Sequence, residues 1–132
     1  MQNHELKQVI ENADNLINQE DFEALMDFYS DDATLVVRPG LNATGKDQIR
    51  KAFIAIAEHF NHSLKVTQGD MVIIESGDIA LVIANAYLKA DKKTDSPFSM
   101  ERKATYVFRK SPTGTWQCAI DNSYGTELLN SH

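Results

Sequence analysis

The chain is 132 residues long, with 42% hydrophobic residues, 24% charged residues and a formal net charge of −6 at pH 7. This length suits one domain with one core, residues 1–132, and the composition lies far from that of disordered chains. The dispersed acidic excess would repel a phosphate backbone, which argues against sequence-independent binding of nucleic acid.

The opening of the chain predicts two helices in tandem. Apolar residues recur every three or four positions over residues 3–18, which indicates a helix with one apolar stripe facing a core. The pattern then breaks, and Asp21 can cap a second, short helix. The apolar residues of that second helix are Phe22, Leu25, Met26 and Tyr29.

A short strand and a third helix follow. Residues 33–37 are β-prone, and the proline and glycine at 39–40 end the strand, because proline lacks a ladder donor and glycine permits the turn. Thr44 with Asp47 three residues later resembles a capping box. The amphipathic helix that follows is expected to stop near Asn61.

The rest of the chain reads as strands. Branched and aromatic residues dominate residues 64–74, 79–88, 100–109 and 116–122. Short turn signals join most of these segments as hairpins, whereas residues 90–97 predict a longer polar link. An antiparallel meander with the helices gathered toward the amino end predicts an α+β fold, in which the sheet curls over the helices and leaves a pocket.

The strand at residues 79–88 is apolar on both of its faces. Its odd positions include Ile79, Leu81 and Ile83, and its even positions include Ala80 and Val82. A strand of this kind implies that the outer face of the sheet is also covered, most economically by a second copy of the chain. We therefore predict a homodimer formed through the sheet face.

Several segments, in their order and spacing, resemble the nuclear transport factor 2-like superfamily over nearly the whole chain. These segments are residues 22–25, 29–35, 45–49, 77–78, 103–107 and 114–116. The ending formed by Trp116, Asp121, Asn122, Ser123, Gly125 and Thr126 is most similar to the SnoaL-like and DUF4440 branch. The resemblance implies a cone-shaped, cystatin-like α+β barrel with an apolar cavity between a curved antiparallel sheet and three helices.

The superfamily that the chain resembles includes ketosteroid isomerase-like enzymes, polyketide cyclases, dehydratases, kinase association domains and transport adaptors. Isomerase chemistry needs a carboxylate base on the first strand and two hydroxyl-type donors. Alignment on residues 31–34 puts Val37 or Arg38 at the position of the base and Ala13 at that of the first-helix tyrosine, while the acidic donor falls near Tyr106. The chain therefore lacks the isomerase catalytic set.

Our leading interpretation is a domain that binds a compact, largely apolar molecule carrying a polar group, with no cofactor. The expected apolar wall consists of Phe28, Phe53, Met71, Tyr87, Tyr106 and Trp116. The expected polar contacts to the ligand come from Asn85, Arg102, Asp121 and Asn122, with Arg38 as a second cation at the cavity mouth.

Two alternatives stay open. The first is a cofactor-independent isomerase, cyclase or dehydratase with Asp121 as acid-base and Tyr106 or Arg102 as oxyanion stabiliser. The second is a homo-oligomeric assembly domain in which the sheet face matters more than the cavity. An ion pair of Asp121 with Arg102 or Lys103 could position a substrate carboxylate or carbonyl, but we favour a structural cross-strand pair.

Neither a metal nor a reactive thiol is expected. His59 and His62 have a spacing that suits two metal ligands, but no companion ligand follows them. Cys118 is expected to pack in the core as an inert thiol, and a single cysteine fits a reducing compartment, with the cytoplasm as the default. The longest apolar runs are strand-sized, so neither secretion nor a membrane span is expected.

Overall fold

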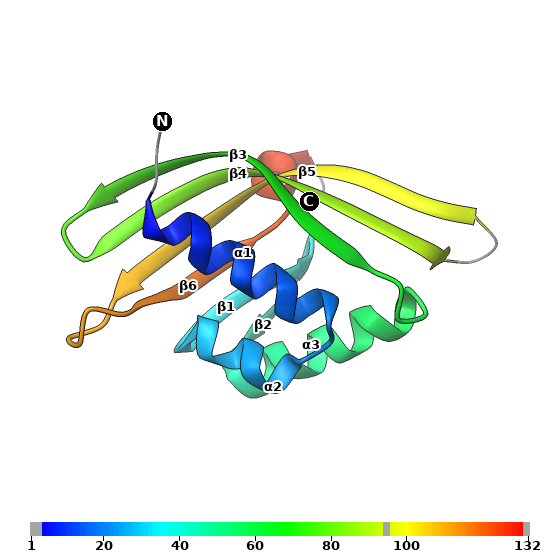
Figure 1. The fold of residues 1–132 in the computed structure, drawn as a ribbon, viewed down its shortest axis with the longest axis horizontal. Coiled ribbons are helices and arrows are strands. Elements are labelled where there is room, and N and C mark those ends of the chain that lie inside the picture. The colour runs from blue at the N-terminus through cyan, green and yellow to red at the C-terminus, as the bar shows by residue number, and fades with distance from the viewer. Residues whose placement is uncertain (1–3, 94–95, 131–132) are drawn as a thin grey trace.

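The computed structural model describes residues 4–93 and 96–130. The helices are α1 (Glu5–Asn18), α2 (Phe22–Leu25) and α3 (Lys46–His59), with short 3-10 turns η1 (Met26–Phe28) and η2 (Gly125–Asn130). The strands are β1 (Tyr29–Arg38), β2 (Leu41–Thr44), β3 (Lys65–Ser76), β4 (Ile79–Lys93), β5 (Ser96–Lys110) and β6 (Trp116–Asn122). Figure 1 shows one curved sheet with α1, α2 and α3 on a single side of it, which confirms the predicted α+β class.

The sheet has the strand order β2-β1-β6-β5-β4-β3, so β2 and β3 are its edges and it curls without closing. Neighbouring strands are antiparallel except for β1 and β6, which pair in parallel near the middle of the sheet. The four strands β3 to β6 form the predicted antiparallel meander, and the parallel pairing of β1 with β6 adds the first strand to it. The first long strand and the last meet there, with Leu35 opposite Asp121.

The strands are longer than the side-chain pattern predicts. β1 begins four residues before the expected strand, and a proline–glycine turn at 39–40 leads into β2, which the sequence analysis missed. The expected link at 90–97 is wrong for its described part, because β4 runs to Lys93 and β5 starts at Ser96, while residues 94–95 lie outside the described chain. Backbone pairing continues between the two strands past the end of the apolar pattern.

Helix α1 presents its apolar stripe to the core. Leu6, Ile10 and Ala13 are almost completely buried, and the helix lies against β3. At its amino end the His4 ring accepts a hydrogen bond from the Leu6 amide, which satisfies one of the free donors of the first turn. The periodicity of residues 3–18 thus predicts this helix correctly.

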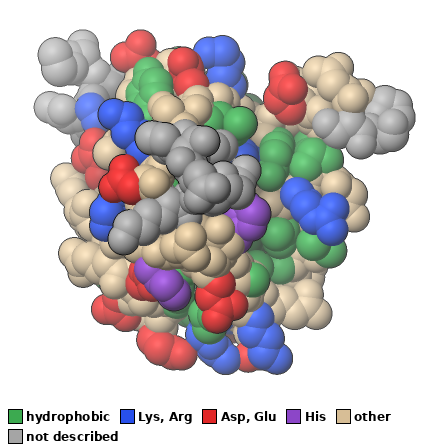
Figure 2. Space-filling view, turned by 90° about the vertical axis from the view of Figure 1, so that its right-hand side faces the viewer, with side chains coloured by type: hydrophobic (Ala, Val, Ile, Leu, Met, Phe, Trp, Pro, Cys, Tyr) green, Lys and Arg blue, Asp and Glu red, His purple; other side chains and the backbone are tan. Residues whose placement is uncertain are grey.

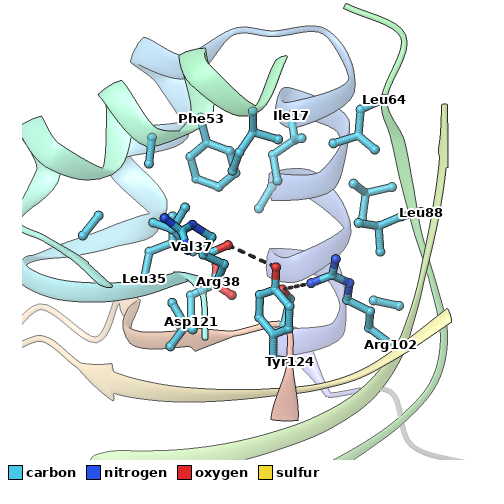
Figure 3. A pocket seen from close by; sticks show the side chains of 18 of the residues that line it. Ile17, Leu35, Val37, Arg38, Phe53, Leu64, Leu88, Arg102, Asp121 and Tyr124 are labelled. Carbon is cyan, nitrogen blue, oxygen red and sulfur yellow. Dashed lines mark hydrogen bonds between the residues drawn. The ribbon is translucent and has the colours of Figure 1, made fainter. Parts of the chain in front are cut away.

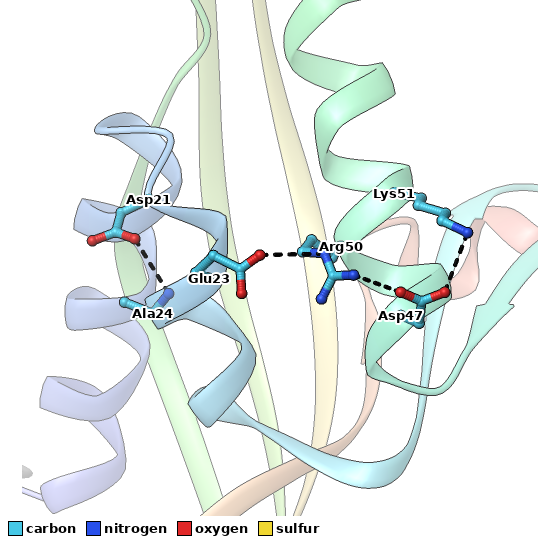
Figure 4. A network of polar contacts seen from close by, with 6 residues as sticks. All are labelled: Asp21, Glu23, Ala24, Asp47, Arg50 and Lys51. Carbon is cyan, nitrogen blue, oxygen red and sulfur yellow. Dashed lines mark hydrogen bonds and ion pairs between the residues drawn. The ribbon is translucent and has the colours of Figure 1, made fainter.

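Helix α2 begins as predicted, with the Asp21 carboxylate accepting a hydrogen bond from the Ala24 amide at 3.2 Å. Figure 4 shows this cap and the neighbouring ion pairs, in which Arg50 of α3 reaches both Glu23 of α2 and Asp47 of its own helix. The acids of these pairs are exposed, so the pairs contribute little to stability.

The capping box predicted for α3 is wrong. Thr44 is the last residue of β2, and the helix starts from Gly45, whose φ of +86° is readily available only to glycine. The Gln48 side chain accepts a hydrogen bond from the Thr44 amide at 2.9 Å instead. At the other end, the helix stops as expected, with Asn61 in the left-handed region at φ +52°.

The core lies between the helices and the concave face of the sheet. Its largest fully buried side chains include Leu25, Ile49, Phe108 and Cys118. Burial, followed by the nearby Asp121 carboxylate, raises the pKa of the Cys118 thiol well above its usual value, so the thiol stays protonated. The buried, protonated thiol of Cys118 agrees with the prediction that this residue packs in the core.

The convex face of the sheet is apolar and open to solvent. Exposed large hydrophobic residues on β3, β4 and β6 are Val72, Ile74, Ile79, Leu81, Ile83, Tyr87 and Ile120. Figure 2 shows one side of the molecule, on which hydrophobic, acidic and basic side chains are interspersed. Over residues 4–93 and 96–130, no helix combines the length and the apolar character needed to cross a membrane.

Candidate functional site

An apolar cavity of about 860 Å³ lies beneath the concave face of the sheet, walled by α1, α3 and the inner faces of the strands (Figure 3). A volume of this size matches the pockets that take drug-sized organic molecules. Side chains such as Ile17, Leu35, Phe53 and Leu88 supply its apolar wall. The site therefore favours a ligand that is itself mostly apolar.

Small residues on the inner face of β4 and β5 leave room for the cavity. Strand alternation turns Ala84 and Ala86 toward the helices, and Ala84 lies opposite Ala104 of β5. All three are at most 3% exposed. Because alanine side chains are short, the sheet and helices can enclose space here without being forced together.

At the floor of the cavity, Asp121 of β6 is held by Tyr29 of β1. The Tyr29 hydroxyl donates a hydrogen bond to Asp121 Oδ2 at 2.7 Å, and both residues are buried. Burial raises the pKa of the Asp121 carboxyl to about 6, although the Tyr29 hydrogen bond acts in the opposite direction. Burial and the Asp121 charge also raise the pKa of Tyr29, which keeps this phenol as the donor.

A second carboxyl, Asp14 of α1, lines the same cavity. Gln68 Nε2 donates to Asp14 Oδ2 at 2.8 Å and lies 3.5 Å from the Tyr106 hydroxyl oxygen. Burial raises the pKa of Asp14 to about 7, the Gln68 hydrogen bond lowers it, and the Asp121 charge raises it further. Two carboxyls that titrate near neutral pH thus share one apolar cavity, a setting that suits proton donors and acceptors.

Six of the residues predicted for the site line the cavity. They are Phe28, Arg38, Phe53, Arg102, Tyr106 and Asp121. The expected ion pair of Asp121 with Arg102 or Lys103 is not found among the described residues, since Asp121 accepts from Tyr29 and Arg102 Nη1 donates to Ser123 Oγ at 3.4 Å. Register explains this outcome, because Tyr106 and not Arg102 lies opposite Asp121.

The structure places the other five predicted residues away from the cavity. Asn85 and Tyr87 lie on the convex face, because Ala86 and Leu88 between and beside them point inward. The Asn122 side chain accepts from the Tyr124 and Gly125 amides and so shapes the turn after β6. Trp116 is buried in the core, with its indole N–H donating to Glu5 at 3.3 Å, and Met71 of β3 is half-buried against the core.

Sequence reasoning missed Asp14, Gln68, Tyr29 and Tyr124. The signal for Asp14 was present, since it lies four residues after Ile10 and three before Ile17 and thus on the buried stripe of α1. An acid on an apolar stripe is costly unless it is paired or neutral, which makes it a marker of function. Tyr29 was read as part of the second helix, but it is the first residue of β1.

The two histidines near the end of α3 have other partners. His62 Nδ1 lies 2.9 Å from Glu20 Oε1, and the His59 ring packs edge-on against Phe60. Within the described ranges, no group of three or more histidine, cysteine, aspartate or glutamate side chains is placed to hold a metal ion.

Comparisons with known proteins agree with this fold. The family described as "SnoaL-like domain" matches residues 6–119, and it is the first of the two branches that the sequence resembles. A search of curated proteins found no match.

Three solved structures illustrate the similarity. An ntf2-like protein with a cystatin-like fold from Novosphingobium aromaticivorans is 18% identical, with a TM-score of 0.75 over 88% of this chain and 76% of that one. A ketosteroid isomerase-like protein from Erwinia carotovora atroseptica is 22% identical, with a TM-score of 0.70 over 87% and 88%. A Catenulispora acidiphila structure in complex with S-DNPA is 12% identical, with a TM-score of 0.72 over 88% and 87%. At these identities the comparison establishes a common fold.

Proposed function

The chain belongs to the SnoaL-like domain family, and on this premise we propose that it binds a compact, largely apolar organic molecule carrying a polar group. The observation that carries the proposal is the cavity of about 860 Å³, whose wall is apolar apart from a few polar groups. Pockets of this composition take small organic ligands and fix their orientation through those groups. The Catenulispora acidiphila structure, whose small molecule is S-DNPA, supports the use of this fold for binding.

The floor of the cavity would receive one polar end of the ligand. Asp14 and Asp121 are 7% and 8% exposed, and Tyr106 adds a hydroxyl beside them. With pKa values of about 7 and about 6, each carboxyl can accept a hydrogen bond as a carboxylate or donate one as an acid near neutral pH. A ligand hydroxyl or carbonyl would therefore find a partner there.

Filling the cavity tests the proposal. Ala52 of α3 lines the cavity, so Ala52→Phe should weaken binding of the neutral fluorescent probe N-phenyl-1-naphthylamine by about tenfold or more, because the ring takes up ligand volume. Ile54→Phe on the exposed side of the same helix is the matched control and should bind normally. A wild-type protein that fails to bind the probe, or an Ala52→Phe protein that is folded and binds it equally well, would overturn the proposal.

A second candidate function is cofactor-independent acid–base catalysis, as in an isomerase, cyclase or dehydratase. It is favoured by the two buried carboxyls, Asp14 and Asp121, with pKa values raised toward neutrality. Asp121 would exchange a proton with the substrate, while Tyr106 would donate a hydrogen bond to a developing oxyanion. Full turnover of a substrate by an Asp121→Asn protein would rule out this role.

We further propose that the protein is a homodimer through its convex sheet face. The support is the exposed apolar surface of β3 and β4, which a second copy would cover. Ile83→Asp at the centre of this face should give the mass of a single chain in light scattering, whereas wild type gives twice that mass. Ile54→Asp is a control of nearly equal exposure, 43% against 42%, and should leave the dimer intact. A wild-type monomer would contradict the proposal.

We also propose that the protein is cytoplasmic. Cys118 is a buried free thiol, which is compatible with a reducing compartment. Fractionation of cells that express the tagged protein would test it, and recovery outside the cytoplasm would disprove it.

A further inference from the structure

The acidic side chains that line the cavity are buried, whereas the cationic ones are more exposed. Its two acids, Asp14 and Asp121, are buried at the floor. Its lysine and arginines, Arg38, Lys51 and Arg102, are exposed or half-buried. A ligand in the cavity would therefore meet cationic groups where the cavity is open to solvent.

Arg102 is held in position by neutral partners. Its guanidinium carbon lies 4.1 Å from the centre of the Tyr124 ring, and its Nη1 donates to Ser123 Oγ. Tyr124 is fixed in turn, because its hydroxyl donates to the Val37 carbonyl at 3.3 Å (Figure 3). Stacking on an aromatic ring orients a guanidinium without cancelling its charge.

The charges of Arg38 and Arg102 are not matched by nearby acids. Lys51 pairs with Asp47 at 3.2 Å, but among the described residues neither arginine lies within ion-pair distance of a carboxylate. Arg38 directly follows Val37, the residue that receives the Tyr124 hydrogen bond, so Tyr124 connects the two arginine-bearing strands. A guanidinium that has no carboxylate partner and lies beside apolar surface is well suited to an anionic oxygen group.

We propose that Arg102, with Arg38 on the neighbouring wall, binds the anionic group of the ligand. The ligand class is then an amphipathic organic anion, with its apolar part in the cavity and a carboxylate, sulfonate or phosphate at the opening. This inference rests on the proposed binding function and adds the charge of the ligand to it. The acids at the floor impose the orientation, since they would repel the anionic end.

A matched pair of probes separates the two proposals. 1-Anilinonaphthalene-8-sulfonate has nearly the same apolar body as N-phenyl-1-naphthylamine and adds one anionic group. Wild type should bind the sulfonate about tenfold or more tightly than the neutral probe, because hydrogen bonds to a charged partner outweigh the cost of removing it from water. Absence of binding for both probes would defeat the binding function itself. Equal affinity for both would overturn only the anion site.

Arg102→Gln supplies the residue-level test. It should weaken binding of the sulfonate about tenfold while leaving the neutral probe unchanged, and Arg102→Lys should keep part of the preference because it keeps the charge. Arg109→Gln is the matched control, since Arg109 is on the same strand but is half-exposed at an ion pair with Asp32, away from the cavity. A sulfonate affinity that is equal in wild type and Arg102→Gln, or a loss of both probes alike in Arg102→Gln and Arg102→Lys, would overturn the role of Arg102.

Competition identifies the anion. Displacement of the neutral probe from wild type by decanoate, decyl phosphate and 1-decanol should favour one of the two anions over the alcohol by about tenfold, and Arg102→Gln should abolish that advantage. Preference for decanoate assigns a carboxylate, and preference for decyl phosphate assigns a phosphate. Equal displacement by all three would contradict the inference.

Discussion

Replacing Asp14 by asparagine is expected to make the protein more stable at pH 8 by up to about 4 kcal/mol, while changing stability little at pH 4. Asp14 has a pKa of about 7 in the folded protein, against 3.8 for an ordinary aspartate. Between pH 4 and pH 7 Asp14 keeps its proton in the folded state and releases it in the unfolded state. The free energy of unfolding therefore decreases as pH rises from about 4 to about 7. Asparagine cannot ionise, and it still offers an oxygen to Gln68 Nε2.

Urea unfolding at a series of pH values measures this effect. The difference between wild type and Asp14→Asn should grow from pH 4 to pH 7 and then level off. Asp78→Asn, at an exposed turn, is the control and should run parallel to wild type. If Asp14→Asn were equally destabilising at every pH, the carboxyl would be contributing through packing or hydrogen bonding and not through its raised pKa.

Replacing Gly125 by alanine is expected to destabilise the fold by about 3 kcal/mol or more. Gly125 has φ +56°, and a Cβ built on it would lie 2.0 Å from the Lys103 carbonyl oxygen, a backbone atom of β5 that cannot simply rotate away. The segment after β6 would have to shift off the sheet. Tyr124 would move with it and no longer stack on Arg102, so the preference for the sulfonate probe over the neutral one should be lost as well.

Gly77→Ala is a nearly ideal control for this prediction. Gly77 has φ +57°, almost the same conformation, but a Cβ built there would meet nothing within 4 Å. Its cost should therefore be about 1 kcal/mol, which reflects the backbone conformation alone. Chemical unfolding of the two variants side by side isolates the clash, and equal losses of stability would show that the turn after β6 relaxes freely.

Local patterns were enough to predict α1, α3 and β6, whose apolar periodicity or β-branched content is strong. They failed where long-range pairing decides the outcome. β2 and the ends of β4 and β5 carry polar residues that read as loops, but neighbouring strands supply hydrogen bonds for their backbones. The parallel pairing of β1 with β6 has no local signature at all, because it depends on how the whole sheet curls.

The candidate site was predictable only in part for the same reason. Alternation along β5 brought Arg102 and Tyr106 to the inner face. Asp121 is there because the register of β6 shifts at Ala119, since strict alternation from Cys118 would have turned Asn122 inward instead. Asn85 and Tyr87 lie on a strand that is apolar on both sides, where alternation does not reveal which face points inward. Asp14 was concealed by its apolar neighbours on α1, although an acid in such company is itself informative.

The junction of β1 with β6 has a consequence for how the protein is made. Tyr29 and Asp121, which bond across it, are separated by 92 positions in the chain. The helices and the five strands β1 to β5 therefore emerge from the ribosome before β6, and their apolar inner surfaces stay uncovered until β6 pairs with β1. Pairing of β6 with β1 would add Asp121 to the cavity that Asp14 lines and complete the cavity wall in a single event, so the nascent polypeptide becomes able to bind only after β6 has been synthesised.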